Sequence, residues 1–237
     1  MTEIIGKKLG MTQIYDKNGA VEPITVIEAG PCFITNLRTN EKNGYVAVQL
    51  GFGKAKKPNK PQVGYFKKNG LKENFRYLKE FRKTTIEGYS LGQEIKVDTF
   101  KMNEVVSVTG TSIGKGFQGA VKRHHFNRGP MTHGSKSHRL PGSSGSGTHV
   151  SHVYKGSRRA GHMGFDVVTT KGLVVLYLDP IKNIIGVRGS VPGPKGKIVY
   201  LKGTGVIAKA RVRRIAAARL EKTAKTAGAA PAKKQSI

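Results

Sequence analysis

One long segment limits what this chain can fold into. From Val105 to Phe165 the sequence has no aspartate or glutamate, yet it holds four lysines, five arginines and all seven histidines of the chain. The segment is also rich in glycine and proline and poor in large apolar residues. Ordering such a segment costs about 1 to 2 kcal/mol per residue in backbone entropy, which so few apolar contacts cannot offset. We therefore expect other structure to hold its ends and a polyanion to bind it.

The net charge of the whole chain points to the same kind of partner. Lysine and arginine total 42 against 14 aspartates and glutamates, which gives a net charge of +28 in 237 residues. Such an excess destabilises an isolated compact fold by self-repulsion. The charge lies largely in glycine-rich sequence without an apolar helical face, so nucleic acid is favoured over an anionic membrane.

The sequence carries few signals for other compartments or for cysteine chemistry. Cys32 is the single cysteine, so an intrachain disulfide and a cysteine-based zinc site are both excluded. The amino-terminal residues resemble a strand, and no signal-peptide or transit-segment pattern is present. We expect the protein to work in the cytoplasm, or in the stroma if the gene belongs to an organelle, without a membrane partner or a small-molecule substrate.

Strand patterns flank the acid-free segment on both sides. Runs rich in β-branched and aromatic residues lie at 21–27, 32–37, 45–52, 93–97, 104–109, 173–178, 184–191 and 197–201. Turn residues such as Asn43-Gly44 separate several of them, as in hairpins. The continuous apolar run at 173–178 predicts a strand covered on both faces. Residues 62–81 have a weak helical periodicity and predict a small α-containing excursion.

Three short strings inside the acid-free segment resemble catalytic motifs. Gly114 to Gly119 match GxGxxG, but the carboxylate that a dinucleotide site needs about twenty residues later is missing. Gly110 to Gly114 match the GxSxG pattern of hydrolases without a nearby acid to orient a histidine. Residues 129–137 resemble a phosphate-binding loop interrupted by an additional serine. None of the three therefore predicts an enzyme.

The histidines of this segment permit two interpretations. His149 and His152 have a spacing that metal ligands use, but no carboxylate or thiolate is close in sequence, and the surrounding cations oppose a metal ion. Imidazoles can instead stack on bases and donate to phosphate. We therefore predict RNA contact rather than a metal site.

Four longer motifs resemble one known family. They are Ile5 to Thr12, Val108 to Arg123, Thr132 to Gly142 and Ala160 to Gly164, and their order and spacing also agree. The chain is similar to the bacterial type of ribosomal protein number three of the large subunit. This resemblance implies a structural, non-catalytic protein that binds large-subunit rRNA and neighbouring ribosomal proteins early in assembly. The resemblance also implies that the protein needs no cofactor of its own, and that any structural Mg²⁺ is bound by the rRNA.

The resemblance also implies the architecture. We expect a mainly-β fold, with a β-barrel of the type found in translation proteins built from 1–53, 91–110 and 165–203. The other parts are a small insertion at 54–90, a basic loop at 111–164 that reaches through rRNA toward the peptidyl transferase region, and an Ala/Lys/Arg-rich tail at 204–237. In the tail we expect a helix near 208–222 that forms or lengthens on nucleic acid, followed by a disordered end; the alternative is a wholly unstructured tail.

The residues predicted to contact RNA are the cations and histidines of the basic loop. They are Lys115, Lys122, Arg123, His124, His125, Arg128, His133, Lys136, His138, Arg139, His149, His152, Lys155, Arg158, Arg159 and His162.

Overall fold

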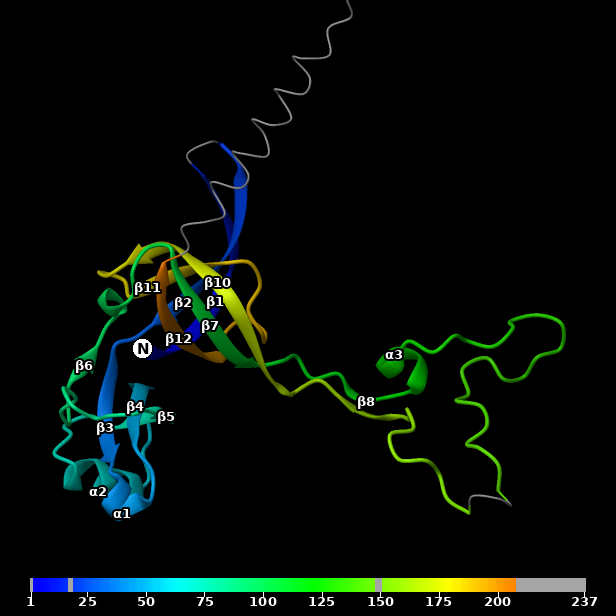
Figure 1. The fold of residues 1–237 in the computed structure, drawn as a ribbon, viewed down its shortest axis with the longest axis horizontal. Helices are drawn as coiled ribbons and strands as arrows, with labels where there is room; N and C mark the ends of the chain where they lie inside the picture. Colours follow the sequence, from blue (N-terminus) through cyan, green and yellow to red (C-terminus); the bar gives the residue numbers. More distant parts are fainter. Residues whose placement is uncertain (1, 17–18, 148–150, 208–237) are drawn as a thin grey trace, which may run out of the picture.

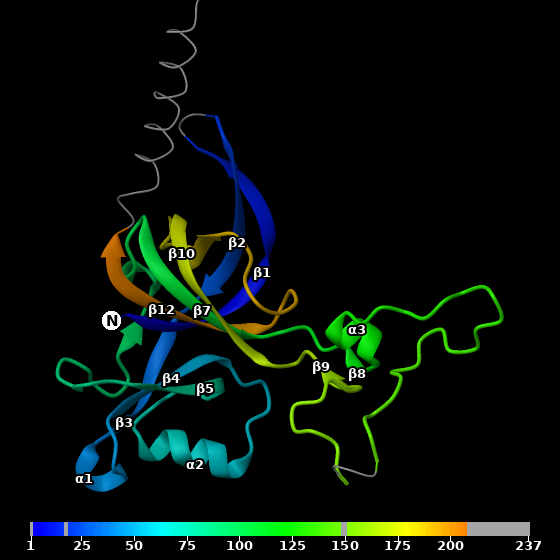
Figure 2. The same ribbon diagram turned by 45° about the vertical axis from the view of Figure 1, so that its right-hand side comes forward.

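The computed structural model describes residues 2–16, 19–147 and 151–207, and within them six strands close into a barrel (Figures 1 and 2). The barrel order is β1-β12-β7-β10-β11-β2, and every neighbouring pair is antiparallel. The strands are β1 (Glu3–Tyr15), β2 (Val21–Ala29), β7 (Glu104–Thr111), β10 (Val167–Asp179), β11 (Ile184–Arg188) and β12 (Ile198–Ile207). The mainly-β prediction is confirmed.

The barrel encloses the main hydrophobic core. Ile5, Ile27, Val108, Ile185 and Leu201 are all fully buried, and each comes from a different barrel strand. Along β7, buried residues alternate with more exposed ones, because side chains alternate between the two faces of a strand. Burying a side chain of this size stabilises the fold by about 1.5 to 3 kcal/mol.

Strand β10 differs from the sequence expectation. The run 173–178 predicted a strand covered on both faces, but Val175 is its single fully buried residue in the described structure and Tyr177 is 44% exposed. A barrel strand has only one inner face, so apolar residues on its outer face remain in contact with water.

A second sheet packs beside the barrel in the order β5-β4-β3-β6. Its strands are β3 (Cys32–Arg38), β4 (Ala47–Lys54), β5 (Phe75–Arg82) and β6 (Glu94–Ile95). The short helix α1 (Asn40–Asn43) joins β3 to β4, and the 3₁₀ helix η1 (Val97–Thr99) leads back to the barrel. Helix α2 (Lys60–Lys68) covers this sheet, where the ring of Phe66 lies 5.7 Å from that of Phe75.

The second sheet corrects two expectations. Residues 1–53 were assigned to the barrel, but β3 and β4 pair with β5 and β6 instead. Alternating apolar residues show that a strand has a buried face, but they do not show which sheet it joins. Helical structure also stops at Lys68, and Phe75–Arg82 is a strand because it pairs with β4 along most of its length.

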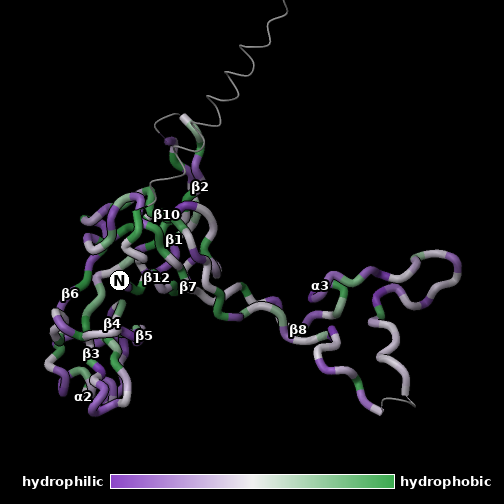
Figure 3. The backbone as a smooth tube through the Cα atoms, in the orientation of Figure 1, coloured by the Kyte–Doolittle hydropathy of each residue, from purple (hydrophilic) through white to green (hydrophobic). Residues whose placement is uncertain are grey.

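The acid-free segment leaves the barrel at the end of β7 and returns at the start of β10, and these two strands are neighbours. It projects away from the barrel as an elongated extension (Figures 1 and 2). Inside it lie β8 (Gly116–Gln118), α3 (Ala120–His124) and β9 (Gly161–Met163). Hydrophobic residues concentrate in the barrel, whereas the extension is mostly hydrophilic (Figure 3).

The predicted helix near 208–222 and most of the tail lie outside the described residues, and residues 204–207 belong to β12. Within the described residues, every helix is too short or too polar to cross a bilayer.

Candidate nucleic-acid interface

A backbone ladder holds the extension where it leaves the barrel. We call residues 112–118 and 161–166 the neck. The amide of Ser112 donates to the carbonyl of Asp166 at 2.8 Å, and the amide of Lys115 donates to that of Met163 at 2.8 Å. Gly164 has φ +75°, and a Cβ there would collide with the carbonyl oxygen of Ile113. The extension has two arms, one that leaves β7 and one that returns to β10. A glycine is therefore required at position 164 for the two arms to come this close.

Two of the predicted RNA-binding residues tie the arms together. In the last turn of α3, the Arg123 guanidinium donates to the carbonyl of Arg159 at 2.9 Å, and His124 Nε2 donates to the same oxygen at 3.1 Å. Gly161 lies against this guanidinium, which a Cβ would displace. Both side chains are half-buried, so they position the neighbouring backbone and leave less of their own surface for RNA.

A third residue closes a turn farther out. The amide of Gly129 donates to the carbonyl of His138 at 3.0 Å, and His138 Nδ1 donates to the carbonyl of Pro130 at 2.9 Å. A Cβ at Gly129 would collide with the carbonyl oxygen of Ser137. This backbone geometry belongs to the string that resembled a phosphate-binding loop, and it shapes the outer part of the extension.

The remaining predicted contact residues point into solvent. Exposed side chains are those of Lys115, Lys122, His125, Arg128, His133, Lys136, Arg139, His152, Lys155, Arg158, Arg159 and His162. His149 lies outside the described residues. These residues are spread along both arms rather than gathered in a single pocket, and their contact with RNA stays a prediction.

No carboxylate neutralises these cations within the described part of the chain. The ion pairs that the structure contains lie in the barrel and the second sheet, for example between Arg38 and Glu80 at 3.0 Å and between Arg188 and Glu22 at 2.6 Å. In the extension the nearest acid is Asp166 at its boundary. The positive potential of the extension is therefore available to an external anion.

The catalytic-looking strings serve local structure. The Ser112 hydroxyl of the GxSxG string accepts from the amide of Asp166 at 3.1 Å in the neck. The GxGxxG string contains the three-residue strand β8 and ends at Gly119, the N-cap of the five-residue helix α3. Among the described residues, no cluster of histidine, cysteine, aspartate and glutamate has the arrangement of a metal site.

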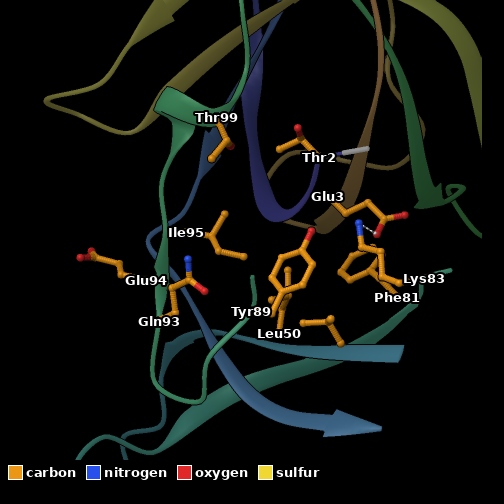
Figure 4. Close-up of a pocket in the computed structure, with 11 residues that line it drawn as sticks. Thr2, Glu3, Leu50, Phe81, Lys83, Tyr89, Gln93, Glu94, Ile95 and Thr99 are labelled. Carbon is orange, nitrogen blue, oxygen red and sulfur yellow. Dashed lines mark ion pairs between the residues drawn. The ribbon is translucent and has the colours of Figure 1, made fainter. Parts of the chain in front are cut away.

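A pocket of about 260 Å³ lies between the barrel and the second sheet (Figure 4), and none of its lining residues belongs to the extension. Its charged groups are already paired, because the buried Glu3 carboxylate lies 2.7 Å from Lys83 Nζ and 2.9 Å from Lys202 Nζ. Apolar residues such as Leu50 and Ile95 form much of the remaining wall. The pocket thus marks the junction of the two sheets.

Buried titratable groups also belong to the barrel side of the molecule. Burial raises the pKa of Cys32 to about 12, and its thiol donates to the carbonyl of Ile5 at 3.4 Å. Desolvation lowers the pKa of Lys8, whose ammonium donates to the carbonyls of Val191 at 2.8 Å and Gly193 at 2.7 Å. The Lys8 ammonium is thus bound by backbone carbonyls inside the protein, whereas most cations of the extension are exposed to solvent.

Comparison with known proteins agrees with these features. The family model described as "Ribosomal protein L3" matches residues 79–180, a range that includes the whole acid-free segment. The Prochlorococcus marinus (strain MIT 9215) protein called "Large ribosomal subunit protein uL3" is 48% identical over 208 residues, which are 87% of this chain and 95% of that protein. The chain belongs to the ribosomal protein L3 family. The resemblance identified from the four motifs is confirmed.

Another member of the L3 family, from a different organism, is similarly close. "Large ribosomal subunit protein uL3c" of Guillardia theta is 46% identical over 201 residues, 84% of this chain and 98% of that protein. A second Prochlorococcus marinus strain, MIT 9312, has a uL3 with 48% identity over 208 residues. The matches to this L3-family chain therefore span most of its length.

Sequence reasoning selected cations and histidines and did not select the exposed aromatic residues of the extension. Phe117 is 76% exposed and Tyr154 is 64% exposed. The ring of Tyr154 lies 6.1 Å from that of His152. The signal that would have found them is their occurrence in a segment without a core, where an aromatic side chain has little to pack against.

Proposed function

We propose that this protein is a non-catalytic structural constituent of the large ribosomal subunit that binds large-subunit rRNA directly through the extension. In this proposal the barrel fixes the position of the protein, and the extension runs between packed RNA helices toward the peptidyl transferase centre. The relatives' names describe proteins of the large ribosomal subunit, which supports the subunit context.

One observation carries the proposal: a cationic extension without internal counter-charges stands on a well-packed barrel. The lysines and arginines of its arms are exposed except Arg123, and no carboxylate pairs with them among the described residues. Each phosphate that they neutralise releases condensed counterions, which is the main source of sequence-independent affinity for nucleic acid.

Recognition of this kind depends on shape more than on a base code. The deep major groove of A-form RNA excludes side chains, so proteins read the arrangement of phosphates, hydroxyls and unstacked bases. An extension whose neck and turns are fixed by backbone hydrogen bonds matches one arrangement of RNA helices better than others. We propose that it binds early in subunit assembly, when these helices first pack, and that neighbouring ribosomal proteins and RNA-bound Mg²⁺ join later.

Sedimentation and competition test this function together. We expect the protein to co-sediment with large subunits in a sucrose gradient. We also expect unlabelled large-subunit rRNA to compete for binding at least about tenfold better than an unrelated RNA duplex at physiological salt. Equal competition by both RNAs would indicate a general nucleic-acid chaperone and contradict the proposal, as would a protein that stays at the top of the gradient.

A further inference from the structure

The short ribbon of β8 and β9 in the neck has an unusual distribution of side chains. Phe117 and His162 are directly opposite each other in the register of the two strands, so their side chains share one face. Gln118 and Met163 alternate with them and belong to the other face, where both are half-buried. One face of the ribbon therefore carries the exposed Phe117 ring, and the opposite face carries the half-buried Met163 side chain.

The Phe117 ring has no cover within the described part of the chain. It is 76% exposed, and no other aromatic ring is paired with it there. The backbone that carries the ring is nevertheless fixed by pairing with β9 and by the hydrogen bond from Lys115 to Met163.

The surroundings of this ring fit a nucleotide. Exposed Lys115 and Lys122 lie on either side of Phe117 in sequence, and no acidic residue occurs between Glu104 and Asp166. An aromatic face held rigidly beside cations can stack on a base while the cations bind the flanking phosphates. A protein partner would instead meet a rim of uncompensated positive charge.

We propose that Phe117 is a stacking platform for an unpaired base of the large-subunit rRNA, with His162 contacting the same nucleotide. The neck then does more than connect the arms to the barrel, since it reads one splayed base at the entrance of the extension. This inference rests on the proposed function, because it names one contact within the RNA interface.

A fluorescent reporter can test stacking directly, because the chain contains no tryptophan. In Phe117→Trp the introduced indole is the single tryptophan of the full-length protein. We expect saturating protein-free large-subunit rRNA to quench its emission by about half or more. The matched control is Ile181→Trp, at a 93% exposed position in the turn after β10, where we expect little change. Equal quenching at both positions would contradict the platform.

Affinity provides a second, independent test. Phe117→Leu keeps an apolar side chain but removes the aromatic face, and we expect it to weaken binding to protein-free large-subunit rRNA about tenfold or more. Phe117→Tyr keeps the face and should bind within about twofold of wild type. The salt dependence should be the same in all three proteins, because stacking neutralises no phosphate.

The outcomes separate this inference from the proposed function. If wild type binds rRNA with a steep salt dependence and Phe117→Leu binds equally well, the platform is refuted and the electrostatic interface stands. That result would assign the exposed ring to a protein neighbour. If wild type shows no preference for rRNA, the proposed function itself fails.

Discussion

The barrel and the extension are held in shape by different interactions. In the barrel, apolar side chains from six strands meet in one core, and buried charges such as Glu3 and Lys8 have partners inside the protein. In the extension, glycines and backbone hydrogen bonds set the shape, and the charges have one sign. Stability and recognition are thus assigned to separate parts, so that changes in one should leave the other largely intact.

The largest expected effect comes from removing the arms. Replacing residues 128–155 by a short Gly/Ser linker should weaken rRNA binding by about a thousandfold, because it removes Arg128, Lys136, Arg139 and Lys155 together with four histidines. The midpoint of thermal unfolding should change little, because none of the described residues in this range belongs to the barrel core. Filter binding and calorimetry measure the two quantities. Loss of cooperative unfolding would mean that the barrel depends on the extension.

A core substitution should have the reverse effect. Ile185→Ala removes a fully buried side chain of β11 and should lower the free energy of unfolding by about 3 kcal/mol. The control is Val153→Ala in the extension, where the side chain is 48% exposed and the expected loss is under about 0.5 kcal/mol. Denaturant titration measures both variants. Equal losses would show that the two regions unfold as one unit and would break the comparison.

The buried ion cluster at the junction of the sheets comes next. Glu3→Gln removes the carboxylate charge that pairs with Lys83, whose side chain is 13% exposed, and should cost about 2 kcal/mol of stability. The surface pair between Lys54 and Glu73 supplies the control, since Glu73→Gln should cost less than about 0.5 kcal/mol. A Glu3→Gln variant as stable as the control would show that the junction does not depend on this carboxylate.

The smallest effect is pH dependent and belongs to the second sheet. Hydrogen bonds from Tyr45 and then from Arg38 hold the pKa of Glu80 below its usual value. A lowered carboxyl pKa stabilises the fold above the pKa of the unfolded state, and this contribution is lost as pH falls through the folded pKa. Glu80→Gln should therefore cost under about 1 kcal/mol at pH 7, after discounting for partial exposure, and less near pH 3. Unfolding titrations at both pH values measure the difference. An equal cost at both would assign the effect to packing.

The sequence predicted the elements of this fold better than their partners. Runs such as 21–27 and 104–109 are strands, and Asn43-Gly44 lies where the chain turns, with Gly44 at φ +74°. Local alternation is sufficient for such predictions. The membership of β3 and β4 in the second sheet depends on pairing with β5, which is distant in sequence and was itself read as helical. Long-range pairing of this kind leaves no local signal.

The candidate interface shows the same limit. The missing acids and the clustered cations located the extension from composition alone. The anchoring of Arg123 and His124 on the carbonyl of Arg159 was not predictable, because it depends on two arms that meet only in three dimensions. The outward orientation of Phe117 depends on the register of β8 with β9 in the same way.

The slope of rRNA affinity against salt concentration tests the central claim most directly. With about six phosphate contacts in the extension, the affinity of the full-length protein should fall on the order of a thousandfold between about 50 and 200 mM salt. The variant lacking residues 128–155 should show a much smaller slope under the same conditions. A flat dependence in the full-length protein, or equal slopes in the two proteins, would contradict the assignment of recognition to the extension.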